Sequence, residues 1–115
     1  MTPDFIFHIC DISAWKLAKE IGHYGGSDLD RRDGFIHFST REQVVDTAKL
    51  HLAGRRGLVL LEVDVKELGI ALKWEKSRNG HLFPHLYGKL PIKAVRNVHE
   101  LHLGDGGIHI FPPGI

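Results

Sequence analysis

The stretch GLVLLEVDV, Gly57 to Val65, predicts a strand more strongly than any other segment of the chain. Its apolar residues follow one another without interruption from Leu58 to Leu61. A strand with apolar side chains on both faces has no side to turn toward water, so it is expected inside a sheet. We therefore predict that residues 57–65 form a central strand around which the other segments pack.

Shorter apolar runs predict the remaining strands. We expect them at 5–9 (FIFHI), at 35–38, within 68–74, and over 92–103, where apolar and polar residues alternate. The segment 82–91 (LFPHLYGKLP) contains two prolines and a glycine. Because proline cannot donate a hydrogen bond to a neighbouring strand, we expect this segment to be irregular or to form a sheet edge.

Two helices are predicted, both in the N-terminal half of the chain. Asp11 or Ser13 is expected to cap the first helix, which ends at Gly22. The second helix is expected to begin at Ser39, because Ser39 and Glu42 match the S-x-x-E capping box.

The polar, glycine-rich stretch 22–34 between these helices is predicted to be a long loop. Together the segments predict an α+β protein with a mostly antiparallel sheet. At 115 residues the chain suits a single domain, 1–115, whose turn-rich tail 104–115 is expected to dock loosely.

The composition excludes few classes of function. It does not favour functions that need a strongly charged protein surface. Fifteen Lys and Arg residues nearly balance 14 Asp and Glu residues, so net charge does not favour broad nucleic-acid or membrane-surface binding. The only cysteine, Cys10, cannot form an internal disulfide. The chain has no 18-residue apolar run and no basic segment before its first apolar run, so we expect a cytoplasmic protein without a membrane span.

Histidine is unusually frequent, with nine residues among 115. His8, His37 and His85 lie within or beside apolar segments, where a buried imidazole needs hydrogen-bonding partners. Each could be a packing residue, but three such residues together predict a shared site. A metal site is the alternative. His81 and His85 have the i, i+4 spacing of a helical metal motif, but Pro84 between them argues against the helix that would align them. We expect no metal.

Other side chains offer weaker chemistry. Ser39, Thr40 and Cys10 are candidate nucleophiles, but no G-x-S-x-G motif surrounds either hydroxyl residue. Arg31 and Arg32 could bind phosphate, or they could pair with the neighbouring aspartates of their own loop.

Five segments in this order closely resemble an uncharacterised bacterial family, domain-of-unknown-function family 952. They are FIFHIC, GFIHFSTREQ, LVLLEVDV, LKWE and LFPHLYGKLP, which lie between residues 5 and 91. That family is thought to be similar in fold to ADP-ribosyltransferases and RNA 2′-phosphotransferases. The resemblance therefore implies a bent or split sheet whose cleft holds NAD.

The same resemblance implies roles for particular residues. His8 matches the position that binds a ribose of NAD, His37 the position beside the nicotinamide, and Ser39 the hydroxyl that follows it. His85 occupies a third position where these enzymes commonly carry glutamate, and Glu75 is a possible substitute. A histidine cannot supply the negative charge of that glutamate, although it can act as an acid or a base near neutral pH.

Three functions follow as hypotheses. The first is an enzyme of the ADP-ribosyl-transfer or phosphotransfer type that binds NAD, a nucleotide or a nucleic-acid end. In that hypothesis the catalytic residues are His8, His37 and His85, and the ligand also contacts Ser39, Thr40, Arg31 and Arg32. The second is a binding domain for a small ligand or nucleotide without catalysis, and the third is a histidine metal site.

Overall fold

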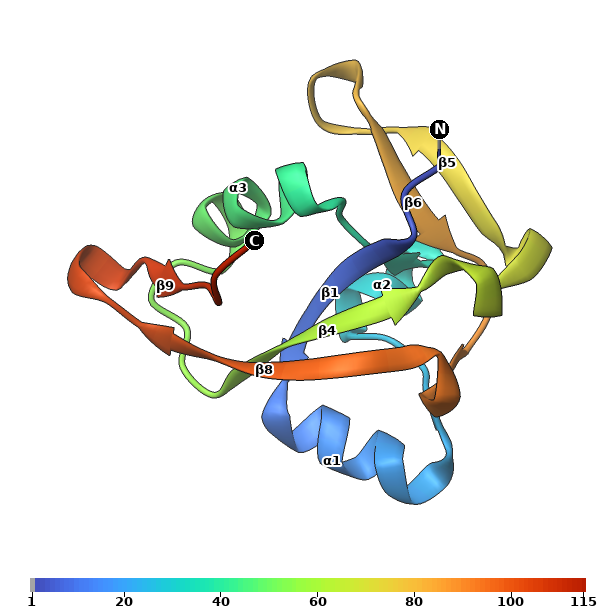
Figure 1. The fold of residues 1–115 in the computed structure, drawn as a ribbon, viewed down its shortest axis with the longest axis horizontal. Helices are drawn as coiled ribbons and strands as arrows, with labels where there is room; N and C mark the ends of the chain where they lie inside the picture. Colours follow the sequence, from blue (N-terminus) through green and yellow to red (C-terminus); the bar gives the residue numbers. More distant parts are fainter. Residues whose placement is uncertain (1) are drawn as a thin grey trace.

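The central sheet of the computed structural model, which describes residues 2–115, is built on β4 (Leu58–Asp64). β4 lies between β1 (Phe5–Asp11) and β8 (Val95–Leu103), and β9 (His109–Ile110) extends the sheet beyond β8. All neighbours are antiparallel, and every β4 side chain except that of Glu62 is buried. The predicted central strand is confirmed, and β1 is left with one free edge (Figure 1).

A second sheet contains β3 (Ile36–His37), β6 (Leu82–Leu86) and β5 (Leu72–Lys76), in that order. The prediction that 82–91 is irregular or an edge is therefore wrong, because β6 is the middle strand. A residue of an antiparallel strand points its N–H and C=O to the same side. Pro84 accepts from the Phe38 N–H at 3.0 Å, so its missing donor faces β3 just where that short strand ends.

The segment 22–34 is not a loop. It contains β2 (His23–Tyr24), which pairs with β7 (Leu90–Pro91), and α2 (Asp28–Asp33). Within residues 2–115 the fold thus has three helices, all in the N-terminal half, rather than the predicted two. The missed signal is local, because Ser27 and Asp30 form a capping box at the start of α2.

The other two helices are α1 (Ile12–Ile21) and α3 (Arg41–His51). α1 follows Asp11 and ends at Gly22, as predicted. The predicted start of α3 at Ser39 is wrong by one residue, since Thr40 is the N-cap and its N–H donates to Gln43 Oε1 at 3.0 Å. Ser39 cannot serve as the cap because its backbone exchanges two 2.8 Å hydrogen bonds with Phe7 of β1.

Two apolar clusters pack against opposite faces of the central sheet. Ile6 and Cys10 of β1 face a cluster that includes Trp15 of α1, while Phe7 faces a second cluster with Val44 of α3. Figure 1 shows α1 and α3 on different sides of β1, consistent with this alternation.

The tail 104–115 returns to the second cluster, where Phe111 and Ile115 pack, and Figure 1 shows the C-terminus beside α3. Short 3₁₀ turns complete the connections: Val65–Glu67, Gly69–Ala71, Arg78–Gly80, Ile92–Ala94 and Asp105–Gly107. No helix within residues 2–115 has the length and apolar character needed to cross a bilayer.

Candidate functional site

A cleft of about 980 Å³ runs along the free edge of β1, between α1, α2 and α3. His8, His37 and His85 all line it, although they belong to three different strands. Strand pairing brings them together, because His37 of β3 is the cross-strand partner of His85 of β6. The bridge between Phe7 and Ser39 then places the end of β3 beside β1, and with it His37 beside His8.

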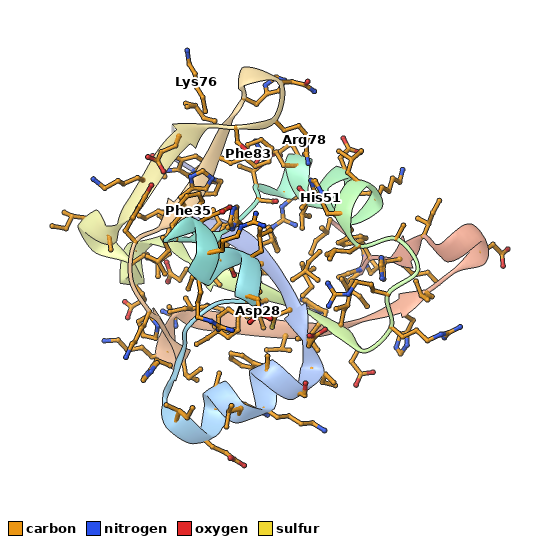
Figure 2. The ribbon with its side chains drawn as sticks, turned by 180° about the vertical axis from the view of Figure 1, so that it is seen from behind. Asp28, Phe35, His51, Lys76, Arg78 and Phe83 are labelled. Atoms are coloured by element: carbon orange, nitrogen blue, oxygen red, sulfur yellow. The ribbon has the colours of Figure 1, made fainter. Side chains whose placement is uncertain are left out.

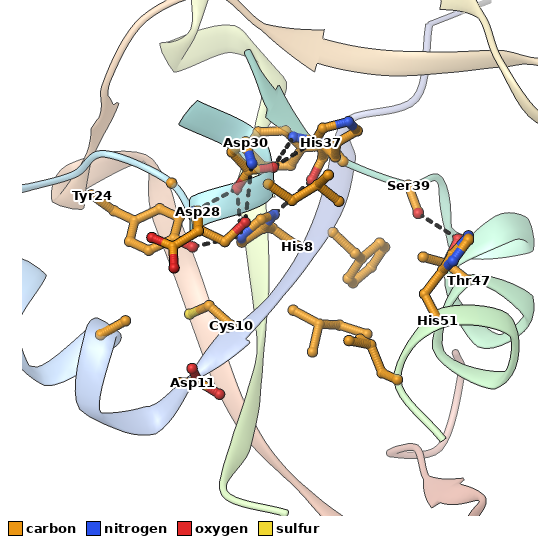
Figure 3. A pocket seen from close by; sticks show the side chains of 18 of the residues that line it. His8, Cys10, Asp11, Tyr24, Asp28, Asp30, His37, Ser39, Thr47 and His51 are labelled. Atoms are coloured by element: carbon orange, nitrogen blue, oxygen red, sulfur yellow. Dashed lines mark hydrogen bonds and ion pairs between the residues drawn. The ribbon is translucent and has the colours of Figure 1, made fainter. Parts of the chain in front are cut away.

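Asp30 of α2 lies at the centre of the site and is only 3% exposed (Figure 3). One of its carboxylate oxygens accepts from the His37 N–H at 3.0 Å and from His37 Nδ1 at 2.5 Å. The other accepts from the Ser27 N–H at 2.8 Å and lies 3.8 Å from His8 Nε2. Burial alone would raise the pKa of Asp30, but the hydrogen bonds from His37 and the nearby His8 lower it to about 2.

His37 is held between two carboxylates. Its Nδ1 contacts Asp30, and its Nε2 lies 3.0 Å from Asp33 Oδ2. The hydrogen bond to Asp30 raises the pKa of His37 above its ordinary value, against the opposing effect of burial. The side chain is 32% exposed and lines the cleft, and its two carboxylate neighbours favour the protonated form of the ring.

His8 has a different environment from that of His37. Its Nδ1 donates to the His37 carbonyl at 2.6 Å, because a carbonyl can only accept, and its Nε2 accepts from the Tyr24 hydroxyl at 2.9 Å. Burial lowers the pKa of His8 and raises that of Tyr24. His8 is therefore a neutral, fully hydrogen-bonded side chain that ties β1 to β2 and β3.

His85 forms a second carboxylate–histidine pair. Its Nδ1 lies 2.8 Å from Glu75 Oε1, which also accepts from the Tyr87 hydroxyl at 2.7 Å. The hydrogen bond from Tyr87, and then that from His85, lowers the pKa of Glu75. The Phe35 ring stacks on the His85 ring at 4.0 Å between centroids, which fixes the imidazole plane. Glu75 thus lies behind His85 rather than replacing it in the cleft.

The hydroxyl and arginine candidates divide into residues on the cleft and residues away from it. Ser39 lines the cleft, and its Oγ lies 3.0 Å from Thr47 Oγ1 of α3. Thr40 is the N-cap of α3 and does not line the cleft. Arg31 lines the cleft, but it is bound to Asp28 and to the Gly26 carbonyl, while the exposed Arg32 pairs with Asp33 outside it.

The metal and thiol alternatives find little support in this geometry. Within residues 2–115, no group of three or more His, Cys, Asp or Glu side chains is arranged to hold a metal ion. Both nitrogens of His8 are already engaged by the protein. Burial raises the pKa of the Cys10 thiol to about 12, so this side chain is a poor nucleophile.

Sequence reasoning missed Asp30, Tyr24 and Thr47 as parts of the site. Asp30 could have been found, since the run Ser27-Asp-Leu-Asp30 matches a helix-capping pattern that predicts a helix there. Tyr24 and Thr47 carry no comparable local signal, because their roles depend on contacts with residues far away in the chain.

The free edge of β1 adds backbone groups to the cleft. Phe7 exchanges both of its backbone hydrogen bonds with Ser39, so its N–H and C=O point away from β4. Alternation along the strand turns the N–H and C=O of Ile9 the same way, toward the cleft that Ile9 lines. A planar amide is complementary to this donor and acceptor pair.

Two kinds of comparison relate the chain to other proteins. Residues 9–98 match the family described as "Protein of unknown function (DUF952)". The crystal structure of CC0527 from Caulobacter crescentus is 42% identical over 92% of this chain and 93% of that chain, with a TM-score of 0.89. The solution NMR structure of CC0527 is also 42% identical, over 92% of this chain and 91% of that chain, with a TM-score of 0.82.

No curated protein matches the chain. The wider similarity to ADP-ribosyltransferases stays a prediction, whereas the resemblance to domain-of-unknown-function family 952 is confirmed over most of the sequence. The chain belongs to the DUF952 family.

Proposed function

We propose that this protein is a nucleotide-binding enzyme that transfers a phosphoryl or ADP-ribosyl group within the β1 cleft. The observation that carries the proposal is the pair of carboxylate-bound imidazoles, Asp30–His37 and Glu75–His85. The two imidazole rings lie 5.7 Å apart between centroids, and both side chains line the cleft. Two histidines at this separation can serve a single reacting group as acid and base.

His37 is the acid in this proposal. Both of its ring nitrogens contact carboxylate oxygens, which can only accept, and the hydrogen bond to Asp30 raises its pKa and so favours the protonated ring. The contact between His37 Nε2 and Asp33 is partly exposed, so a bound ligand can replace Asp33 at small energetic cost. The Nε2 proton is then available to a leaving oxygen or to a phosphate oxygen.

His85 is the base. Glu75 holds its Nδ1–H, which leaves Nε2 as the proton acceptor of the neutral ring. Within residues 2–115, Nε2 of His85 makes no hydrogen bond. Removal of a proton from an attacking hydroxyl by His85, and protonation of the leaving group by His37, would complete one transfer.

Nucleotides are the favoured ligands because the cleft combines complementary groups for their parts. The backbone edge at Ile9 suits an amide or a base edge, and the serine and threonine hydroxyl oxygens can accept hydrogen bonds from ribose hydroxyls. NAD fits this set of groups, and the resemblance to ADP-ribosyltransferases points in the same direction. When bound, NAD would supply an activated ribosyl carbon.

The test combines binding and turnover. NAD, a nucleoside 2′,3′-cyclic phosphate and a ribose 2′-phosphate nucleotide are each added to the protein. Binding is followed by NMR shifts of the His37 and His85 ring signals, and products are followed by chromatography. We expect saturable shifts with at least one ligand and a loss of turnover of about 100-fold or more in His37→Gln and in His85→Gln.

His102→Gln is the matched control, since the His102 side chain is 74% exposed on β8 and lies outside the cleft. It should bind and react as the unsubstituted protein does. Saturable binding without turnover would show that the protein is a nucleotide-binding domain rather than an enzyme. No shift with any of the three ligands would overturn the proposal.

A further inference from the structure

One arginine of the cleft has no acidic partner. Arg31, Arg55 and Arg78 line the cleft. Arg31 is paired with Asp28 and Arg55 with Asp11, whereas Arg78 makes no ion pair within residues 2–115. A cation that faces a cleft without a carboxylate within 4 Å is available to an anionic ligand.

Arg78 is held in a defined orientation. It lies in the turn between β5 and β6, and its guanidinium carbon sits 4.9 Å from the centroid of the Phe83 ring. Its Nη2 lies 3.4 Å from Thr47 Oγ1 of α3. Figure 2 shows Arg78 between Phe83 and His51, where this turn approaches α3. These contacts restrain one end of the guanidinium, whose other N–H groups make no hydrogen bond within residues 2–115, and Arg78 lines the cleft.

The side chains around Arg78 are also suited to an anion. Thr47 and His51 are four residues apart and therefore share one face of α3. Thr47 donates to the Gln43 carbonyl at 3.1 Å, so it receives the hydrogen bonds from Ser39 and Arg78. The Arg78 guanidinium and the His51 imidazole thus lie at one end of the cleft, beside two hydroxyl groups whose protons are already donated within the protein.

The acidic groups of the cleft lie elsewhere and are neutralised by the protein. Asp28 pairs with Arg31, Asp11 with Arg55, and Asp30 with His37. Arg78 therefore brings an unpaired positive charge to this end of the cleft within the described residues 2–115, although the whole chain has a formal net charge of only +1. A guanidinium with free N–H groups is the group that proteins commonly use to bind phosphate oxygens.

We propose that Arg78, with His51 beside it, forms a phosphate subsite that binds a phosphate or diphosphate group of the nucleotide. The identity of the molecule that carries the phosphate group rests on the proposed function, whereas the affinity of the subsite for phosphate does not. The subsite makes the substrate class a phosphorylated nucleoside and discriminates against an uncharged nucleoside. Arg78 binds the ligand in this assignment, while His37 and His85 carry out the transfer.

The probes for this subsite are inorganic pyrophosphate, AMP and adenosine, titrated by calorimetry and by NMR. The variants are Arg78→Gln, Arg78→Lys and the control Arg56→Gln. Arg56 is exposed, makes no ion pair within residues 2–115 and does not line the cleft, so it matches Arg78 in charge alone. Thermal melting of each variant verifies that it is folded.

We expect pyrophosphate and AMP to bind the unsubstituted protein and to shift the signals of Thr47 and His51. Arg78→Gln should weaken both by about tenfold or more, Arg78→Lys should restore part of the affinity, and Arg56→Gln should change neither. Adenosine should bind weakly and equally to all forms. Equal losses in Arg78→Gln and Arg56→Gln would overturn the subsite, since they would reflect net charge alone.

The two proposals fail in different ways. If pyrophosphate requires Arg78 but AMP binds no more tightly than pyrophosphate, and none of the nucleotides is turned over, the phosphate subsite stands and the nucleotide function fails. If Arg78→Gln binds and turns over nucleotides as the unsubstituted protein does, the nucleotide function stands and the subsite is wrong.

Discussion

At the scale of single residues, Asp30 links the two halves of the candidate site. Its buried carboxylate holds His37 directly, lies close to His8, and accepts from the backbone at the start of α2. A charge in such a position is tolerated only because several donors surround it. Asp30 therefore couples the stability of the fold to the protonation of the site.

Asp30→Asn should lower the free energy of unfolding near pH 7. The pKa of Asp30 falls from its ordinary 3.8 to about 2 in the folded protein, a difference worth about 2 kcal/mol. Since the pKa of Asp30 is lower in the folded protein, the ionised carboxylate stabilises the fold above pH 3.8. This stabilisation disappears as the pH falls toward 2. Urea denaturation should show a loss of about 2 kcal/mol at neutral pH that shrinks below pH 4.

Asp28→Asn is the control for this measurement, because Asp28 lies on the same helix with a side chain that is 99% exposed. Its substitution should change the free energy of unfolding by less than about 0.5 kcal/mol. Equal stability of Asp30→Asn and the unsubstituted protein at neutral pH would contradict the role assigned to Asp30.

His37 and His8 should titrate on opposite sides of the ordinary histidine pKa of 6.5. The Asp30 hydrogen bond raises the pKa of His37, so its contribution to stability is complete below 6.5 and is lost as the pH rises through the folded value. Burial lowers the pKa of His8, so this residue costs stability as the pH falls below 6.5. NMR of the ring protons, assigned with His37→Gln, measures both midpoints, and a common midpoint would refute the prediction.

At the scale of elements, the turn into α2 determines where Asp30 lies. Gly26 has φ +97°, and a Cβ at this position would lie 2.7 Å from Asp30 Cβ and 3.3 Å from Ile36 Cγ1. Only glycine combines that backbone conformation with so close an approach. The turn therefore allows α2 to press its buried carboxylate against β3.

Gly26→Ala should destabilise the protein by about 2–4 kcal/mol, from the left-handed backbone and the clash together. It should also move the ring signals of His37, because Asp30 must shift. Gly25→Ala is the neighbouring control, since Gly25 has no atom within 4 Å of an added Cβ and no positive φ. Chemical denaturation measures the free energy of unfolding of both variants. Equal values would show that the turn tolerates a side chain at Gly26.

At the scale of the whole molecule, the tail completes the second apolar cluster. Phe111 and Ile115 pack against it, and buried His109 lies with its Nε2 2.7 Å from the Arg55 carbonyl. These contacts join the last residues of the chain to β1, α3 and the turn before β4.

Removal of residues 104–115 should lower the free energy of unfolding by at least about 2 kcal/mol, because apolar surface of the second cluster becomes exposed. Thermal and urea unfolding measure the loss. Ile108→Thr is the control, since the Ile108 side chain is 46% exposed and its substitution should stay within about 0.5 kcal/mol. An unchanged unfolding midpoint after truncation would show that the tail adds no stability.

Elements with a strong local pattern could be predicted from the sequence. β4 and α1 were predicted closely, because uninterrupted apolar residues, a cap and a terminal glycine act over a few neighbours. The loop predicted for the polar, glycine-rich stretch 22–34 is wrong, since the capping box there opens a helix of only six residues. β6 was misread because Pro84 costs nothing where its partner strand ends, and that depends on a distant segment.

Residue type and periodicity were enough to predict the α+β class and the central strand, and to select His8, His37 and His85 as candidates. The pairing of His37 with Asp30 and of His85 with Glu75 emerged from the three-dimensional fold. The fold also decided that Arg78, rather than Arg31 or Arg32, lines the cleft without an acidic partner within residues 2–115. The physical reason is that protonation and ion pairing depend on groups within a few ångströms, and strand register brings those groups together from distant parts of the chain.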